Sequence, residues 1–176
     1  DQLFAQGRLD EAAAAYRQLA DSERGAVADH YRLRAAETLR DNGKLDEVAS
    51  QLEDIRRRRL HGEDLARFDL LEAEIALHRH DPARADALLD AIDREASPAM
   101  HMRVLELRAR SQLARGDAFT AAHTRAQLDR DLQGLDREHN RKELLTTLAT
   151  IDVQTLRDRF STLAPDDPLR PWIEQA

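Results

Sequence analysis

The segment Gly43-Lys44-Leu45-Asp46-Glu47-Val48 sets the architecture of this chain, because altered copies of it recur along the sequence. The other copies are Gly7-Arg8-Leu9-Asp10-Glu11-Ala12, His80-Asp81-Pro82-Ala83-Arg84-Ala85 and Gly116-Asp117-Ala118-Phe119-Thr120-Ala121. Their first residues, which we call the anchors, are 36, 37 and 36 positions apart. A nearly constant period of this size is typical of stacked helical hairpins, which offer a long surface but carry no chemistry by virtue of their fold.

Apolar residues flank the anchors at helical spacing. Around Gly43 they are Tyr31, Leu33, Ala35, Ala36 and Leu39 before it, and Leu45, Val48, Ala49, Leu52 and Ile55 after it. We therefore expect one helix to end at each anchor and another to begin just after it, with the anchor glycine supplying a left-handed turn. Strand-forming residues are scarce, with only four Val and five Ile in 176 residues, so the predicted fold class is all-α.

Superposition of the repeats on their anchors places small residues at two recurrent positions. One position holds Ala36, Ala73 and Ala109, and the other holds Ala12, Val48, Ala85 and Ala121. Helices cross closely only where short side chains meet, so the pattern predicts antiparallel hairpins of the tetratricopeptide type, stacked as a right-handed solenoid. The pattern departs from that type in its longer period, in His80 replacing Gly, and in Arg125 standing where an aromatic residue is expected.

The sequence predicts two parts of one domain. Residues 1–133 hold the repeats, the first of which lacks its opening helix, and residues 134–176 hold additional C-terminal helices. In this second part we expect helices over Glu138–Ala149 and Asp152–Leu163, with Asp152 as an N-cap, then a turn over 164–168 and a last helix carrying the only Trp. The chain begins without Met, and we interpret it as a fragment that continues at both ends.

Composition narrows the classes of partner. The chain has 34 acidic and 27 basic residues, a net charge of −7, which disfavours binding to a phosphate backbone, so no nucleic-acid partner is expected. It contains no cysteine and therefore has neither disulfides nor thiolate metal sites.

No motif for catalysis or for a cofactor occurs in the sequence. The best metal-ligand cluster is His78, His80 and Asp81, but residues two positions apart on a helix point about 200° apart, so no metal site is predicted. Nucleophile elbows, phosphate loops and dinucleotide fingerprints are absent. We accordingly predict a protein that is not an enzyme and that has no cofactor.

The run Arg56-Arg57-Arg58-Arg59 permits two interpretations. It could contact anionic lipid or nucleic acid, but four consecutive helical residues point around the whole helix and form no single basic face. The favoured interpretation is the end of a helix, with cations near the last carbonyls and Leu60 turned inward.

The candidate partner-binding groove is the inner face of the opening helices, where charges alternate. Its predicted residues are His30, Leu33, Glu37, Arg40, Arg67, Leu70, Glu74, His78, Arg103, Glu106 and Arg110. Such a groove could hold an extended peptide or a partner helix. The alternative is that these charges pair within the chain, for example Arg67 with Glu37 or Glu74 with Arg110.

Several segments carry a family resemblance. They are Tyr31-Arg32-Leu33-Arg34-Ala35-Ala36-Glu37, Asn42-Gly43-Lys44-Leu45, Leu71-Glu72-Ala73-Glu74-Ile75-Ala76-Leu77, Leu107-Arg108-Ala109-Arg110-Ser111-Gln112, Asn140-Arg141-Lys142-Glu143-Leu144-Leu145-Thr146-Thr147-Leu148 and Pro171-Trp172-Ile173-Glu174. Together they resemble the N-terminal domain of LpoA-type penicillin-binding-protein activators.

This resemblance implies an outer-membrane lipoprotein that reaches through the periplasm and stimulates a class A penicillin-binding protein in peptidoglycan synthesis. It implies a lipid-bearing Cys upstream as the membrane anchor and a periplasmic-binding-protein-like domain downstream that touches the synthase. The present chain would then be a monomeric arm whose groove meets an envelope protein or peptidoglycan. The competing hypotheses are a tetratricopeptide scaffold in the cytoplasm or at the inner membrane, and a helical ligand-binding or hydrolytic domain.

Overall fold

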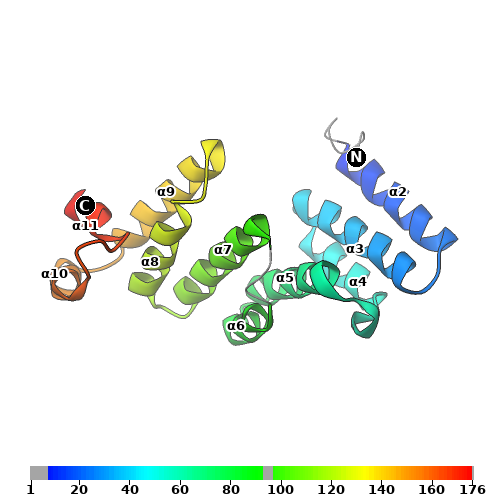
Figure 1. Cartoon of the computed structure of the whole chain (residues 1–176), viewed down its shortest axis with the longest axis horizontal. Coiled ribbons are helices and arrows are strands. Elements are labelled where there is room, and N and C mark those ends of the chain that lie inside the picture. Colours follow the sequence, from blue (N-terminus) through cyan, green and yellow to red (C-terminus); the bar gives the residue numbers. More distant parts are fainter. Residues whose placement is uncertain (1–7, 93–96, 176) are drawn as a thin grey trace. The chain divides into compact units, whose positions relative to one another are not determined.

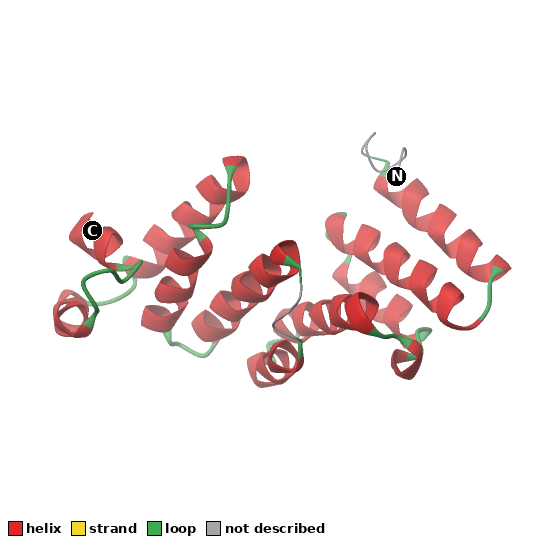
Figure 2. Ribbon diagram, in the orientation of Figure 1, coloured by secondary structure: helices red, strands yellow, loops and turns green. Residues whose placement is uncertain are grey.

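A computed structural model describes residues 8–92 and 97–175, and this part of the chain consists of helices and loops without a strand (Figure 2). The all-α prediction is confirmed. The helices are α2 (Leu9–Ser22), α3 (Gly25–Asp41), α4 (Leu45–Glu53), the short 3₁₀ helix η1 (Arg57–Arg59), α5 (Gly62–His78), α6 (Pro82–Ala91), α7 (Pro98–Ala114), α8 (Ala118–Leu128), α9 (Gly134–Leu148), α10 (Val153–Thr162) and α11 (Arg170–Gln175).

The chain divides into two compact units. The first extends to Asp81 and includes a short stretch from Asp90, and the second contains Pro82–Leu89 and everything from Ser97 onward. The second unit thus contains the predicted boundary between residues 133 and 134. That boundary and the right-handed stacking of the hairpins stay predictions.

Three of the four anchors form the same helix-ending turn. The amide of the residue after each anchor donates to a carbonyl five residues earlier: Lys44 to Leu39 at 3.0 Å, Asp81 to Ala76 at 2.8 Å and Asp117 to Gln112 at 2.9 Å. This geometry needs a left-handed anchor residue. The φ angles are +75° at Gly43, +59° at His80 and +82° at Gly116, so His80 adopts the conformation that glycine has elsewhere. Gly7 lies outside the described residues.

The small residues at the two recurrent positions are all buried, as predicted. Each is at most 3% exposed, and together they are Ala12, Ala36, Val48, Ala73, Ala85, Ala109 and Ala121. Among the helices that carry these residues, α2 contacts α3, α3 contacts α4 and α7 contacts α8 (Figure 1).

The core of the first unit joins helices α2 to α5. Fully buried Leu33 and Leu39 of α3 belong to the same apolar cluster as Leu52 of α4 and Leu71 of α5. Leu60, which follows the arginine run, is 3% exposed and belongs to this cluster too, so its predicted inward position is confirmed.

The arginine run plays a different role from the one predicted. Helix α4 already ends at Glu53, and the last three arginines form η1, where two of them bind buried carboxylates instead of helix carbonyls. Arg57 donates to both oxygens of Asp69 at 2.9 and 2.8 Å, and Arg59 lies 3.6 Å from Asp29. Because Asp29 and Asp69 are almost fully buried, the run anchors the α4–α5 connection to the core of the first unit.

The second unit ends in a cluster around the only Trp. Both predicted helices are present, although α9 begins at Gly134, four residues before the predicted start, and Asp152 caps α10 as predicted by accepting a hydrogen bond from the Thr155 amide at 2.9 Å. Trp172 of α11 is half-buried against an apolar cluster that includes Leu144 and Leu148 of α9. Arg141 lies over its ring at 5.5 Å, so α11 is docked on α9 by apolar and cation–π contacts.

Arg141 also belongs to a charge cluster at the α8–α9 connection. It donates to Asp129 at 2.8 Å, and Arg137 donates to the same carboxylate at 3.1 Å. Asp129 is 5% exposed. Burial favours its neutral form, but the hydrogen bonds from Arg141 and Arg137 outweigh burial and hold the pKa of Asp129 below its ordinary value.

Candidate binding site

Three consecutive helices of the second unit build the candidate site. Helix α7 begins at Pro98 after Ser97, whose hydroxyl accepts from the Met100 amide, and α8 begins after Asp117, which accepts from the Thr120 amide at 3.1 Å. Helix α8 packs against both α7 and α9, which lie on either side of it (Figure 1). Local capping signals therefore start α7 and α8, and the recurrent small residues Ala109 and Ala121 lie on this pair, whereas α9 begins at Gly134 without a side-chain cap and packs against α8.

A cavity of about 670 Å³ lies among these helices. Its polar lining comes from Arg103, Glu106 and Arg110 of α7, Arg125 of α8, and Asp136, His139, Asn140 and Glu143 of α9. Its apolar lining comes from Ala99, Met102, Leu128 and Leu132. A volume of this size, with an apolar wall and several convergent polar groups, is typical of a ligand site.

Arg125 is the buried charge of this cavity, with 6% of the residue exposed. Burial lowers its pKa below the ordinary value, and the attraction of Glu143 and Glu106 only partly opposes that effect. One nitrogen, Nη1, donates to the Asn140 side-chain oxygen at 3.3 Å, and Asn140 in turn donates to the Arg125 carbonyl at 3.0 Å. Asn140 thereby fixes the position of Arg125 in the cavity wall.

Of the other charged residues of the cavity, Arg103, Glu106, Arg110 and Glu143 are half-buried, whereas Asp136 is exposed. Arg103 donates to Glu106 at 2.5 Å, and Glu143 lies 3.7 Å from Nη2 of Arg125. Arg110 is close enough to lower the pKa of Arg125 further. This arrangement can bind charged groups, and its basic and acidic side chains suit a ligand that carries both apolar and ionic parts.

The predicted groove residues divide between the two units. Arg103, Glu106 and Arg110 line the cavity of the second unit, whereas the other eight belong to helices α3 and α5 of the first. Of those eight, Leu33, Leu70 and Glu74 are at most 7% exposed. Leu33 belongs to the core cluster, so the surface that a partner could touch is smaller than the predicted set.

The charged groove residues of the first unit pair within the chain. Glu37 lies 2.8 Å from Arg34 and 3.9 Å from Arg67, which confirms the proposed Arg67–Glu37 contact. Arg67 also binds Glu63, and Arg40 binds Asp41. Glu74 and Arg110 also have interaction partners, so neither is a free charge.

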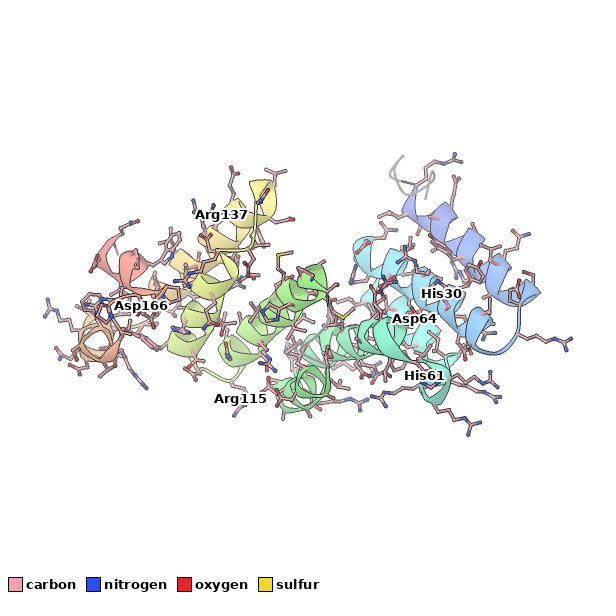
Figure 3. The ribbon with its side chains drawn as sticks, in the orientation of Figure 1. His30, His61, Asp64, Arg115, Arg137 and Asp166 are labelled. Carbon is pink, nitrogen blue, oxygen red and sulfur yellow. The ribbon has the colours of Figure 1, made fainter. Side chains whose placement is uncertain are left out.

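The two histidines of the predicted groove lie near carboxylates of neighbouring helices. Nδ1 of His30 on α3 lies 2.8 Å from Asp64 at the start of α5, and Figure 3 shows these two side chains next to each other. His78 is exposed at the end of α5, and its Nε2 lies 3.8 Å from Asp46 of α4. These contacts join helices of the first unit, and a cavity of about 220 Å³ lies beside His78, lined also by residues 43–47.

Sequence reasoning missed five polar residues of the cavity: Arg125, Asp136, His139, Asn140 and Glu143. The four residues of α9 were missed because the repeat pattern fades after Gly134, so no register placed them on the inner face. Arg125 did carry a signal, since it stands where the repeat pattern expects an aromatic residue.

The described residues show neither a metal site nor a membrane span. Within residues 8–92 and 97–175, no group of three or more His, Asp or Glu side chains is placed to hold a metal ion. None of the helices described there combines the length and apolar character needed to cross a bilayer.

Comparison with protein families decides the relationship of the chain. The family described as "LppC putative lipoprotein" matches residues 10–175, nearly the whole chain. The chain belongs to this lipoprotein family. A search of curated proteins found no match.

Solved structures share the fold of this chain. A monoclinic form of Haemophilus influenzae LpoA matches with a TM-score of 0.74, and its separate N-terminal domain with 0.71, both at 20% sequence identity. Each match covers 92% of this chain, and it covers 73% of the N-terminal-domain structure but 30% of the longer LpoA chain. At this identity the likeness shows a shared fold, which is the LpoA-type all-α N-terminal domain.

Proposed function

We propose that this chain is a non-catalytic domain of an outer-membrane lipoprotein that activates a class A penicillin-binding protein. The observation that supports this most strongly is the match of residues 10–175 to a lipoprotein family, together with the LpoA-type fold. The domain acts as a periplasmic arm and as a surface for a protein partner, and the synthase itself is contacted by a further domain of the parent protein.

The architecture of the second unit supports a binding role. Its cavity gathers positive, negative and apolar side chains, a combination that suits recognition of a ligand. A monomeric domain with a preformed cavity between its helices suits recognition of another envelope component.

The direct test is reconstitution with the full-length parent lipoprotein and a purified class A penicillin-binding protein from the same bacterium. We expect the full-length protein to raise the rate of glycan polymerisation or cross-linking from lipid-linked precursor. A parent lacking residues 1–176 should keep part of this stimulation in solution but lose it in cells, where the arm is needed for reach. Absence of stimulation by the full-length protein would contradict the proposal.

Cell fractionation separates this proposal from a cytoplasmic or inner-membrane scaffold. The proposal expects the full-length protein in the outer-membrane fraction, with a lipidated cysteine at its mature N-terminus identified by mass spectrometry. Recovery in the cytoplasm, or with the inner membrane through a hydrophobic helix, would favour the scaffold.

A further inference from the structure

Arg125 occupies a position that the repeat pattern would fill with an aromatic side chain. It nevertheless lies in the packed α8 helix, with 6% of the residue exposed, in the wall of the cavity. A buried cation costs free energy unless partners satisfy its charge and its hydrogen-bond donors.

The donors of Arg125 are largely unused among the described residues. A guanidinium has five N–H groups, yet the contact with Asn140 at 3.3 Å is a long hydrogen bond. The Glu143 carboxylate at 3.7 Å lies beyond hydrogen-bond distance. Nε of Arg125 is shielded from solvent and has no hydrogen-bond partner at all. The charge is therefore held in place by Asn140 and incompletely neutralised.

The surroundings indicate which chemical group would complete the site. Arg110 adds positive potential beside Arg125, and the Glu143 side chain is 37% exposed, so it can move aside. The planar guanidinium fork matches a carboxylate, which can accept two parallel hydrogen bonds from it. The cavity wall next to these charges is apolar and consists of Met102, Leu128 and Leu132. This wall suits an apolar side chain adjacent to the carboxylate.

We propose that this cavity binds a carboxylate of an extended protein segment, with Arg125 as the principal contact. The proposal rests on the function proposed above, since it names the chemistry that the interaction surface recognises. The carboxylate can come from a chain terminus or from an acidic side chain next to an apolar residue. The cavity of about 670 Å³ holds a few residues of such a segment.

Nuclear magnetic resonance tests the proposal directly, because the Arg125 Nε–H group gives its own signal. The ¹⁵N-labelled 176-residue protein is titrated with three peptides: acetyl-Ala-Leu-Ala-Leu with a free carboxyl, the same peptide as an amide, and acetyl-Ala-Leu-Glu-Leu-amide. We expect at least one of the two acidic peptides to shift the Nε signal and the amides of α7 and α9, and the neutral amide to leave them unchanged. The acidic peptide that acts identifies a terminal or a side-chain carboxylate.

Substitutions then assign the effect to Arg125. Arg125→Gln should weaken binding of the active peptide about tenfold, because a charge-assisted hydrogen-bond pair is lost. Arg125→Lys keeps the charge without the fork and should weaken it less. The matched control is Arg157→Gln, an exposed arginine of α10 outside the cavity, which should leave affinity unchanged. Circular dichroism verifies the fold of each variant. If Arg125→Gln does not fold, the binding comparison is made with Arg125→Lys instead.

Two results overturn the carboxylate assignment: shifts of equal size with all three peptides, or no shift with any of them. The assignment would also be overturned if Arg125→Lys and Arg157→Gln weakened binding of the peptide equally. These failures leave the reconstitution with the penicillin-binding protein unaffected, so loss of this inference and loss of the proposed function are distinguishable.

Discussion

Buried carboxylates bound by exposed or half-buried arginines are the main polar feature of this molecule at the scale of single residues. Asp69 is 2% exposed and Asp129 is 5% exposed, and each is bound by arginines from another part of the chain. Such pairs contribute less than their geometry suggests, because desolvation offsets much of the attraction. Removing one partner, however, leaves an uncompensated buried charge.

Replacing Arg57 tests this asymmetry in the first unit. Arg57→Ala removes both hydrogen bonds to the Asp69 carboxylate, and we expect the free energy of unfolding to fall by about 2–3 kcal/mol. The matched control is Arg58→Ala, because Arg58 is an exposed neighbour in the same 3₁₀ helix, and a change within about 0.5 kcal/mol is expected. Urea unfolding measures both. Equal losses in the two variants would show that the run acts through its total charge.

Asp129 should make the second unit sensitive to acid. Its pKa is depressed in the folded state, so the stabilisation that it provides is fully present above the ordinary value of 3.8 and is lost as pH falls through the folded pKa. We expect Asp129→Asn to be less stable than wild type at pH 6, and the difference to shrink below about pH 4. Urea midpoints at several pH values measure this. Asp131→Asn, at an exposed position two residues away, should track wild type throughout.

Helix-ending turns are the features that matter most at the scale of elements. Gly116 has a φ of +82°, and a Cβ added there would meet no atom within 4 Å. Any effect of a side chain at this position therefore comes from the backbone conformation alone. His80 has the equivalent turn with a Cβ already present, at a φ of +59°.

These two anchors should respond in opposite directions. Gly116→Ala is expected to lower the free energy of unfolding by about 1 kcal/mol, because a left-handed conformation is strained for residues with a Cβ. His80→Gly relieves the same strain, and a gain of up to about 1 kcal/mol is expected, reduced by the greater freedom of glycine in the unfolded chain. Thermal or urea unfolding gives both values. Destabilisation by His80→Gly would indicate that the imidazole makes a contribution that outweighs the strain.

At the scale of the whole molecule, each unit has an apolar core of its own among the residues that the structure describes. One joins α2 to α5, and the other lies around α8, α9 and the C-terminal helices, where the only Trp is packed. Trp172 therefore reports on the second unit alone, whereas circular dichroism reports on both.

We expect Leu71→Ala to separate the two transitions. Leu71 is 1% exposed in the core of the first unit, and its truncation should cost about 3 kcal/mol. The circular dichroism transition should then begin at lower urea concentration, while the Trp172 fluorescence transition stays in place. A fluorescence midpoint that moves together with the circular dichroism midpoint would show that the two units unfold as one.

The sequence by itself determined the helices, their turns and the packed positions. Periodic apolar residues, caps such as Asp152 and the recurrent anchors are local signals, and they located the helix pairs on both sides of Gly43, His80 and Gly116. The family resemblance rested on the same segments and agrees with the match to the lipoprotein family.

Only the tertiary structure decided which charged side chains bind a partner within the chain and where a ligand could bind. Whether Arg57 or Arg58 binds a carboxylate depends on the fold of α5 beside η1, and the cavity depends on α9, which the repeat pattern does not reach. The physical reason is that helix formation and close packing follow from residues three or four apart, whereas burial of Arg125 and its unused donors result from contacts between helices.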